Sequence, residues 1–137
     1  MPFPIETLIP HRDPMRWIDD LIDCTETTAT AVATFGPGHL AVENGFVLET
    51  ALVECVAQTV AAALGCRAAN RKPSDILSSG GMLVAVSNFK IEQRPPAGST
   101  LRIEIEERKK FGPMLLVSGR IFWNDRLVAS GELTLYA

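Results

Sequence analysis

Hydrophobic and polar residues alternate most regularly just after residue 100, where Leu101, Ile103 and Ile105 are separated by an arginine and a glutamate. A period of two places the apolar side chains on one face of a β-strand and the charged ones on the other. Other runs rich in apolar, β-branched or aromatic residues indicate further strands. They cover residues 15–22, 28–35, 82–92, 114–123 and 127–136.

Turn-forming residues separate the strands of the second half. The connections are Pro-Pro-Ala-Gly at 95–98, Phe-Gly-Pro at 111–113 and Asn124-Asp125. Gly, Pro, Asn and Asp in these positions are typical of tight reversals. We therefore predict hairpin connections at all three places and an antiparallel meander of strands.

One segment, residues 47–64, has the composition of a long helix. It is rich in Ala and Leu, contains no proline, follows the turn Asn44-Gly45 and reaches Gly65, a plausible C-terminal cap. Its apolar residues surround most of the helix, so we expect burial on more than one side. The sequence predicts an α+β domain in which one curved sheet and a second copy of the chain together cover the helix.

Composition narrows the range of functions. The chain has 137 residues, 47% of them hydrophobic, which predicts one domain over residues 1–137. Thirteen basic and 16 acidic residues give a net charge of −3, so the basic excess of a nucleic-acid-binding protein is missing. The apolar stretch 46–64 is interrupted by Glu49, Glu54 and Gln58, and no membrane span is expected.

Three cysteines cannot all pair within the chain, and the N-terminus lacks the pattern of a secretory signal. We therefore expect a cytoplasmic protein with reduced thiols. The cysteines and two histidines match no zinc-binding spacing, and no metal site is predicted.

Glu54 is the most informative polar residue, because it lies mid-helix in the apolar run Ala-Leu-Val-Glu-Cys-Val-Ala. Burial raises the pKa of a carboxyl and suits it to proton transfer near neutral pH. Thr50 and Gln58 lie four residues to either side and share its helix face, which predicts a pocket wall. The alternative is a solvated stripe on an ordinary amphipathic helix.

His11 is a candidate base, because Pro10 and Pro14 stiffen the loop that carries it. Imidazole is the side chain that ordinarily titrates nearest neutral pH. The alternative is an exposed loop histidine. His39, in a glycine-rich loop, competes for the same role but has a more flexible backbone.

Three blocks of the sequence resemble the β-hydroxyacyl-acyl-carrier-protein dehydratases of the FabZ type, including relatives from aryl-polyene biosynthesis. The first is Leu-Ile-Pro-His-Arg-Asp-Pro-Met at 8–15, followed by Asp19. The second is Glu-Cys-Val-Ala-Gln at 54–58, similar to the Glu-x-x-Ala-Gln of the family's helix. The third runs from Phe89-Lys90 through Pro95 and Gly98 to Leu101.

The resemblance implies a hotdog fold, in which a curved antiparallel sheet wraps around a long helix and two chains pair. It implies a lyase that removes water from a 3-hydroxyacyl thioester to give a trans-2-enoyl thioester, as in fatty-acid or polyene synthesis. His11 and Glu54 would be the catalytic pair, contributed by different subunits. Thr50 and Gln58 would contact substrate. The chain departs from the family by having Glu49 where glycine is usual, but backbone donation does not need glycine, so the Thr50 N–H would still serve as the oxyanion donor. No metal or redox cofactor is required.

The implied partners are an acyl thioester on an acyl carrier protein or coenzyme A, and a second subunit in a homodimer, a higher even oligomer or a heterodimer with a homologue. Acyl carrier proteins are acidic, so docking is expected near basic residues. The candidates are Arg67, Arg71, Lys72, Lys90 and Arg94. Two alternatives to the dehydratase are a hotdog acyl thioesterase and a non-catalytic acyl-binding partner subunit.

Overall fold

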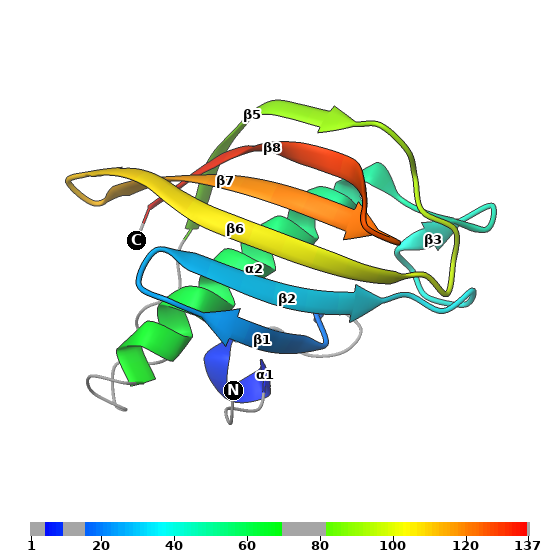
Figure 1. The fold of residues 1–137 in the computed structure, drawn as a ribbon, viewed down its shortest axis with the longest axis horizontal. Helices are drawn as coiled ribbons and strands as arrows, with labels where there is room; N and C mark the ends of the chain where they lie inside the picture. The colour runs from blue at the N-terminus through cyan, green and yellow to red at the C-terminus, as the bar shows by residue number, and fades with distance from the viewer. Residues whose placement is uncertain (1–4, 10–15, 70–81, 137) are drawn as a thin grey trace.

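The computed structural model describes residues 5–9, 16–69 and 82–136. A curved six-stranded antiparallel sheet lies across one long helix, α2 (Figure 1). A short helix, α1, lies beside the C-terminal part of α2. The helices are α1 (Ile5–Leu8) and α2 (Glu49–Ala69). The strands are β1 (Asp20–Cys24), β2 (Thr28–Thr34), β3 (Val42–Glu43), β4 (Phe46–Val47), β5 (Met82–Ile91), β6 (Thr100–Phe111), β7 (Met114–Trp123) and β8 (Arg126–Tyr136).

The predicted meander is correct for β6, β7 and β8 but wrong for β5. The strands are ordered β1-β2-β6-β7-β8-β5, so β5 pairs with β8 at the edge of the sheet. Residues 95–98 therefore form a crossing connection instead of a hairpin. This connection is bonded to the separate β3–β4 hairpin, through the Val47 N–H donating to Pro95 O at 2.8 Å and a bridge between Phe46 and Pro96.

The two other predicted hairpins are confirmed. Asn124 and Asp125 have φ angles of 51° and 60°, the left-handed pair that joins β7 to β8 in a two-residue turn. Gly112, with φ of 61°, turns β6 into β7. Asn44-Gly45 is also a turn, as predicted. It joins two short strands, β3 and β4, that the sequence pattern did not predict.

The long helix is confirmed with different ends. Prediction placed it at 47–64 with Gly65 as its cap, whereas α2 spans Glu49–Ala69. Gly65 lies inside the helix because α1 crosses it there: a Cβ atom on Gly65 would lie 2.4 Å from the backbone oxygen of Leu8. The glycine permits close packing of two helices and does not end one.

The N-terminal strand prediction is partly wrong. Residues 15–22 were expected as a strand, but residues 16–19 are irregular and β1 covers Asp20–Cys24. β1 carries a bulge between Leu21 and Asp23, which breaks the alternation. Residue 15 of the predicted strand lies outside the described residues, as do residues 10–14, which include the candidate base His11.

Most faces of α2 are buried within the chain. Leu52, Cys55 and Val56 are completely buried against the sheet. By length and composition the stretch Glu49–Arg67 is apolar enough to cross a membrane, but 61% of that segment is buried inside the protein, as expected of a core helix. On β5, at the edge of the sheet, Val84 and Val86 are 52% and 44% exposed.

Candidate functional site

The candidate site lies along one face of α2, where exposure falls from the start of the helix toward its middle. Thr50 is exposed, Glu54 is partly buried, and Gln58 is only 1% exposed. Their spacing of four residues places them in one row. The row therefore leads from solvent into the core.

Gln58 bonds Glu54 to a distant part of the chain. Its Nε2 donates to a carboxylate oxygen of Glu54 at 3.0 Å, and its Oε1 accepts the Trp17 N–H at 2.8 Å and the Ile18 N–H at 3.4 Å. Two donors on Oε1 and an acceptor at Nε2 determine how the amide is oriented. Gln58 therefore positions Glu54 and anchors the segment that follows the His11 loop. The predicted contact of Gln58 with substrate stays a prediction.

The first backbone N–H groups of α2 have no hydrogen-bond acceptor among the described residues. Leu48 is the residue whose carbonyl accepts the first helical bonds, from the N–H groups of Ala51 and Leu52. The N–H groups of Glu49 and Thr50 precede them and have no acceptor within the helix. A side-chain oxygen usually caps such groups, but leucine has none. This end of the helix can therefore receive a substrate oxygen, four residues from Glu54.

Of the two histidines considered as the catalytic base, the structure describes only His39. His11 lies outside the described residues, so its pairing with Glu54 stays a prediction. The Nδ1 atom of His39 accepts the Ala41 N–H at 2.9 Å, and its ring packs edge-on against Phe35 and Trp17, with centroids 4.9 and 6.2 Å apart. These contacts give His39 a structural role in its loop.

Two of the basic residues predicted to dock a carrier protein have internal partners. Arg67 donates to Thr25 O at 2.8 Å and forms an ion pair with Glu107. Arg94 donates to backbone oxygens beside the start of α2. Lys90 is exposed and stays a candidate. Within the described residues, no three His, Cys, Asp or Glu side chains gather as metal ligands do.

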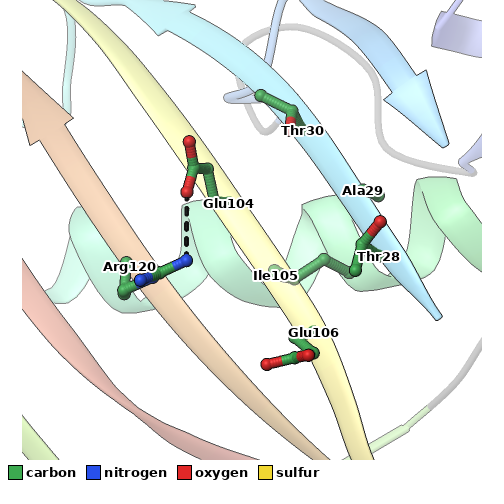
Figure 2. A pocket seen from close by; sticks show the side chains of 7 residues that line it. All are labelled: Thr28, Ala29, Thr30, Glu104, Ile105, Glu106 and Arg120. Carbon is green, nitrogen blue, oxygen red and sulfur yellow. Dashed lines mark hydrogen bonds and ion pairs between the residues drawn. The ribbon is translucent and has the colours of Figure 1, made fainter. Parts of the chain in front are cut away.

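A polar pocket of about 260 Å³ lies over β2, β6 and β7, on the face of the sheet opposite α2 (Figure 2). Each of its charged groups has an ion-pair partner: Arg120 pairs with Glu104 at 3.2 Å inside the pocket, and Glu106 pairs at 3.1 Å with Arg108, which lies outside the lining. It contains neither a histidine nor a cysteine. The α2 face remains the better candidate for chemistry.

Solved structures share this fold over most of the chain. The dehydratase heterocomplex ApeI:P from Xenorhabdus doucetiae matches with a TM-score of 0.89 and 18% identity, covering 99% of this chain and 91% of that one. The E. coli PaaI protein from the phenylacetic acid degradation operon matches with a TM-score of 0.67 and 15% identity, covering 86% and 82%. Zebra fish thioesterase superfamily member 2 matches with a TM-score of 0.69 and 12% identity, covering 94% and 88%.

These likenesses confirm the predicted hotdog fold. No curated protein sequence matches the chain significantly. The profile of the ApeP-like family, described as ApeP dehydratase, matches residues 3–137. That match covers nearly the whole chain, and the protein therefore belongs to the ApeP-like dehydratase family.

Proposed function

We propose that the protein removes water from a 3-hydroxyacyl thioester, carried by an acyl carrier protein, to give a trans-2-enoyl thioester for polyene-type synthesis. The family supports dehydration. The observation that carries the proposal is the Glu54 carboxyl group, which the buried Gln58 amide holds in the second turn of α2, close after the N–H groups of Glu49 and Thr50 at the helix start. A thioester oxygen at the helix start would direct the acyl chain along this row.

The reaction needs one base and one acid. The thioester carbonyl acidifies the hydrogen on C2, and hydroxide leaves C3 readily only when it is protonated. His11 takes the C2 proton, the C2–H electron pair forms the C2=C3 double bond, and Glu54 gives its proton to the departing hydroxyl, which leaves as water. The backbone N–H of Thr50 stabilises the negative charge on the thioester oxygen, assisted by the positive end of the α2 dipole.

A second subunit completes the proposed site. Among the described strands β5 lies at the edge of the sheet with no strand on its outer side, and its exposed Val84 and Val86 make it suitable for pairing. The opposite edge, β1, carries Asp20, Asp23 and a bulge, features that discourage such pairing. We propose that β5 meets β5 of another hotdog chain, and that His11 of one chain acts beside Glu54 of the other.

The test uses purified protein with 3-hydroxyacyl and saturated acyl thioesters. An enoyl product supports the dehydratase, free thiol supports a thioesterase, and neither product supports a binding subunit. His11→Ala and Glu54→Gln should each lower dehydration by about 10²-fold or more. Glu106→Gln, which removes a carboxylate on the far face of the sheet, is the matched control and should leave the rate unchanged. Normal rates in both site variants would refute the assignment.

Mixing the two inactive variants tests whether the site is shared. If His11 and Glu54 come from different chains, heterodimers of His11→Ala with Glu54→Gln contain one intact site and recover part of the activity. Continued inactivity after verified subunit exchange would show that each site belongs to one chain.

A second candidate function is that of a partner subunit. It is favoured by the similarity to a structure of a dehydratase heterocomplex, and by the acidic Glu49 at the position where FabZ-type relatives usually have glycine. In this case the protein would form a pocket wall for a catalytic homologue. Activity that appears only when a homologous dehydratase is added, and that survives Glu54→Gln, would favour this function.

A further inference from the structure

Arg94 connects the loop after β5 to the hairpin that precedes α2. Its Nε donates to Val47 O at 2.9 Å, and one terminal nitrogen donates to Glu43 O at 3.2 Å and to Phe46 O at 3.3 Å. The side chain is partly buried. In Figure 1, the connection that follows β5 runs beside the hairpin labelled β3, where these bonds are made. One guanidinium therefore holds three carbonyl groups of a single hairpin.

The hairpin is a weak element that requires outside support. β3 and β4 have two residues each and form a sheet of their own, apart from the six-stranded sheet. An isolated two-stranded hairpin is at best marginally stable in water. It is anchored to the loop after β5 by Arg94 and by two backbone bonds, Val47 N–H to Pro95 O at 2.8 Å and Ala97 N–H to Gly45 O at 2.9 Å. A third bond, from the Leu48 N–H to Ala41 O at 2.8 Å, joins the two ends of the hairpin itself.

The position of this hairpin determines where α2 begins. Val47 is the last residue of β4, and the next residue, Leu48, accepts the first helical hydrogen bonds. A displacement of the Val47 carbonyl is therefore transmitted over two residues to the N–H of Glu49 and over three to that of Thr50. These are the groups that must point at the thioester oxygen in the proposed reaction.

We infer that Arg94 is a positioning residue for the dehydration step, which holds the β3–β4 hairpin so that the first N–H groups of α2 are aimed at the thioester oxygen. The inference rests on the proposed function. A cation near a helix N-terminus is electrostatically unfavourable, so the three carbonyl bonds must compensate for that placement. A planar, multi-donor guanidinium can bond several carbonyls at once, whereas the single ammonium of lysine is less able to do so.

The test compares Arg94→Met and Arg94→Lys with Arg126→Met. Arg126 is a suitable control because it is exposed and its side chain makes a 3.5 Å bond to the Gln93 side chain. Two measurements are made on the intact protein, with its partner subunit if one is required. The first is kcat and KM for a 3-hydroxyacyl thioester, and the second is amide hydrogen exchange at Val47 and Leu48.

Arg94→Met should lower kcat by about 10²-fold, the loss expected when a reacting group is displaced by about 1 Å. KM should change by less than about threefold, since the donors act most strongly on the charge of the transition state. Exchange at Val47 and Leu48 should accelerate by about tenfold or more. Arg94→Lys should lie between wild type and Arg94→Met, and Arg126→Met should match wild type in both measurements.

The measurements separate this inference from the proposed function. Unchanged exchange in Arg94→Met would overturn the positioning role whatever the activity. Faster exchange with an unchanged kcat would overturn the link to catalysis and leave the proposed function intact. A wild-type protein without dehydratase activity, alone or with a homologue, would refute the proposed function and with it the catalytic part of this inference. If Arg94→Met does not fold, the same criteria apply to Arg94→Lys.

Discussion

Replacing Gln58 by leucine removes the amide that joins Glu54 to the segment after the His11 loop while nearly preserving side-chain volume. In the structure Oε1 accepts the Trp17 N–H at 2.8 Å and Nε2 donates to Glu54 at 3.0 Å. Loss of an acceptor for a buried N–H costs about 1–3 kcal/mol. Loss of the bond to Glu54 adds about 1 kcal/mol, since that carboxyl is only partly buried.

The expected destabilisation of Gln58→Leu is therefore about 2–3 kcal/mol, because the added apolar surface of leucine offsets part of the loss. Urea unfolding followed by tryptophan fluorescence measures this change directly. Dehydration should fall by about 10²-fold under conditions where the variant is fully folded, since Glu54 is no longer held in place.

Thr59→Val is the matched control for this substitution. Thr59 is the next residue of α2 and is equally buried, and its hydroxyl donates to the Cys55 carbonyl one turn earlier at 2.7 Å. That carbonyl belongs to the helical ladder already, so the loss should be below about 1 kcal/mol and the activity unchanged. If Gln58→Leu is as stable and as active as Thr59→Val, the reasoning about Gln58 is refuted.

Two further predictions concern packing and thiols. Gly65→Ala should lower stability by about 1–3 kcal/mol, because the new methyl group meets the Leu8 backbone, whereas Gly36→Ala, with no atom within 4 Å of its added Cβ, should not. Thermal unfolding of both variants checks this. Burial raises the pKa of Cys24 to about 11 and raises that of the completely buried Cys55 as well. A disulfide reagent should therefore react slowly with Cys24 at pH 8, and the reaction rate should rise about tenfold per added pH unit up to that pKa. Cys55 should react only after unfolding. Mass spectrometry of the labelled thiols measures both reactions.

Features of this protein that depend on neighbouring residues could be predicted from the amino-acid sequence. The alternation at 101–106 predicted the buried and exposed faces of β6, and Asn124-Asp125 predicted the turn into β8. Both follow from local backbone geometry, which a few consecutive residues control. The three short blocks at 8–15, 54–58 and 89–101 together also predicted the family, because each is a run of neighbouring residues and their order along the chain is read directly from the sequence.

Features that depend on residues distant in the chain emerge only when the protein is folded. Gly65 is typical of a helix end by its residue type, but in the fold it lies where α1 crosses α2. The sequence around β5 predicts one arm of a hairpin, but in the fold β5 pairs with β8. Gln58 meets Trp17 across 41 residues, and Arg94 meets Val47 across 47. No local propensity encodes such pairs, because they form only when the sheet closes around the helix and brings both partners to one place.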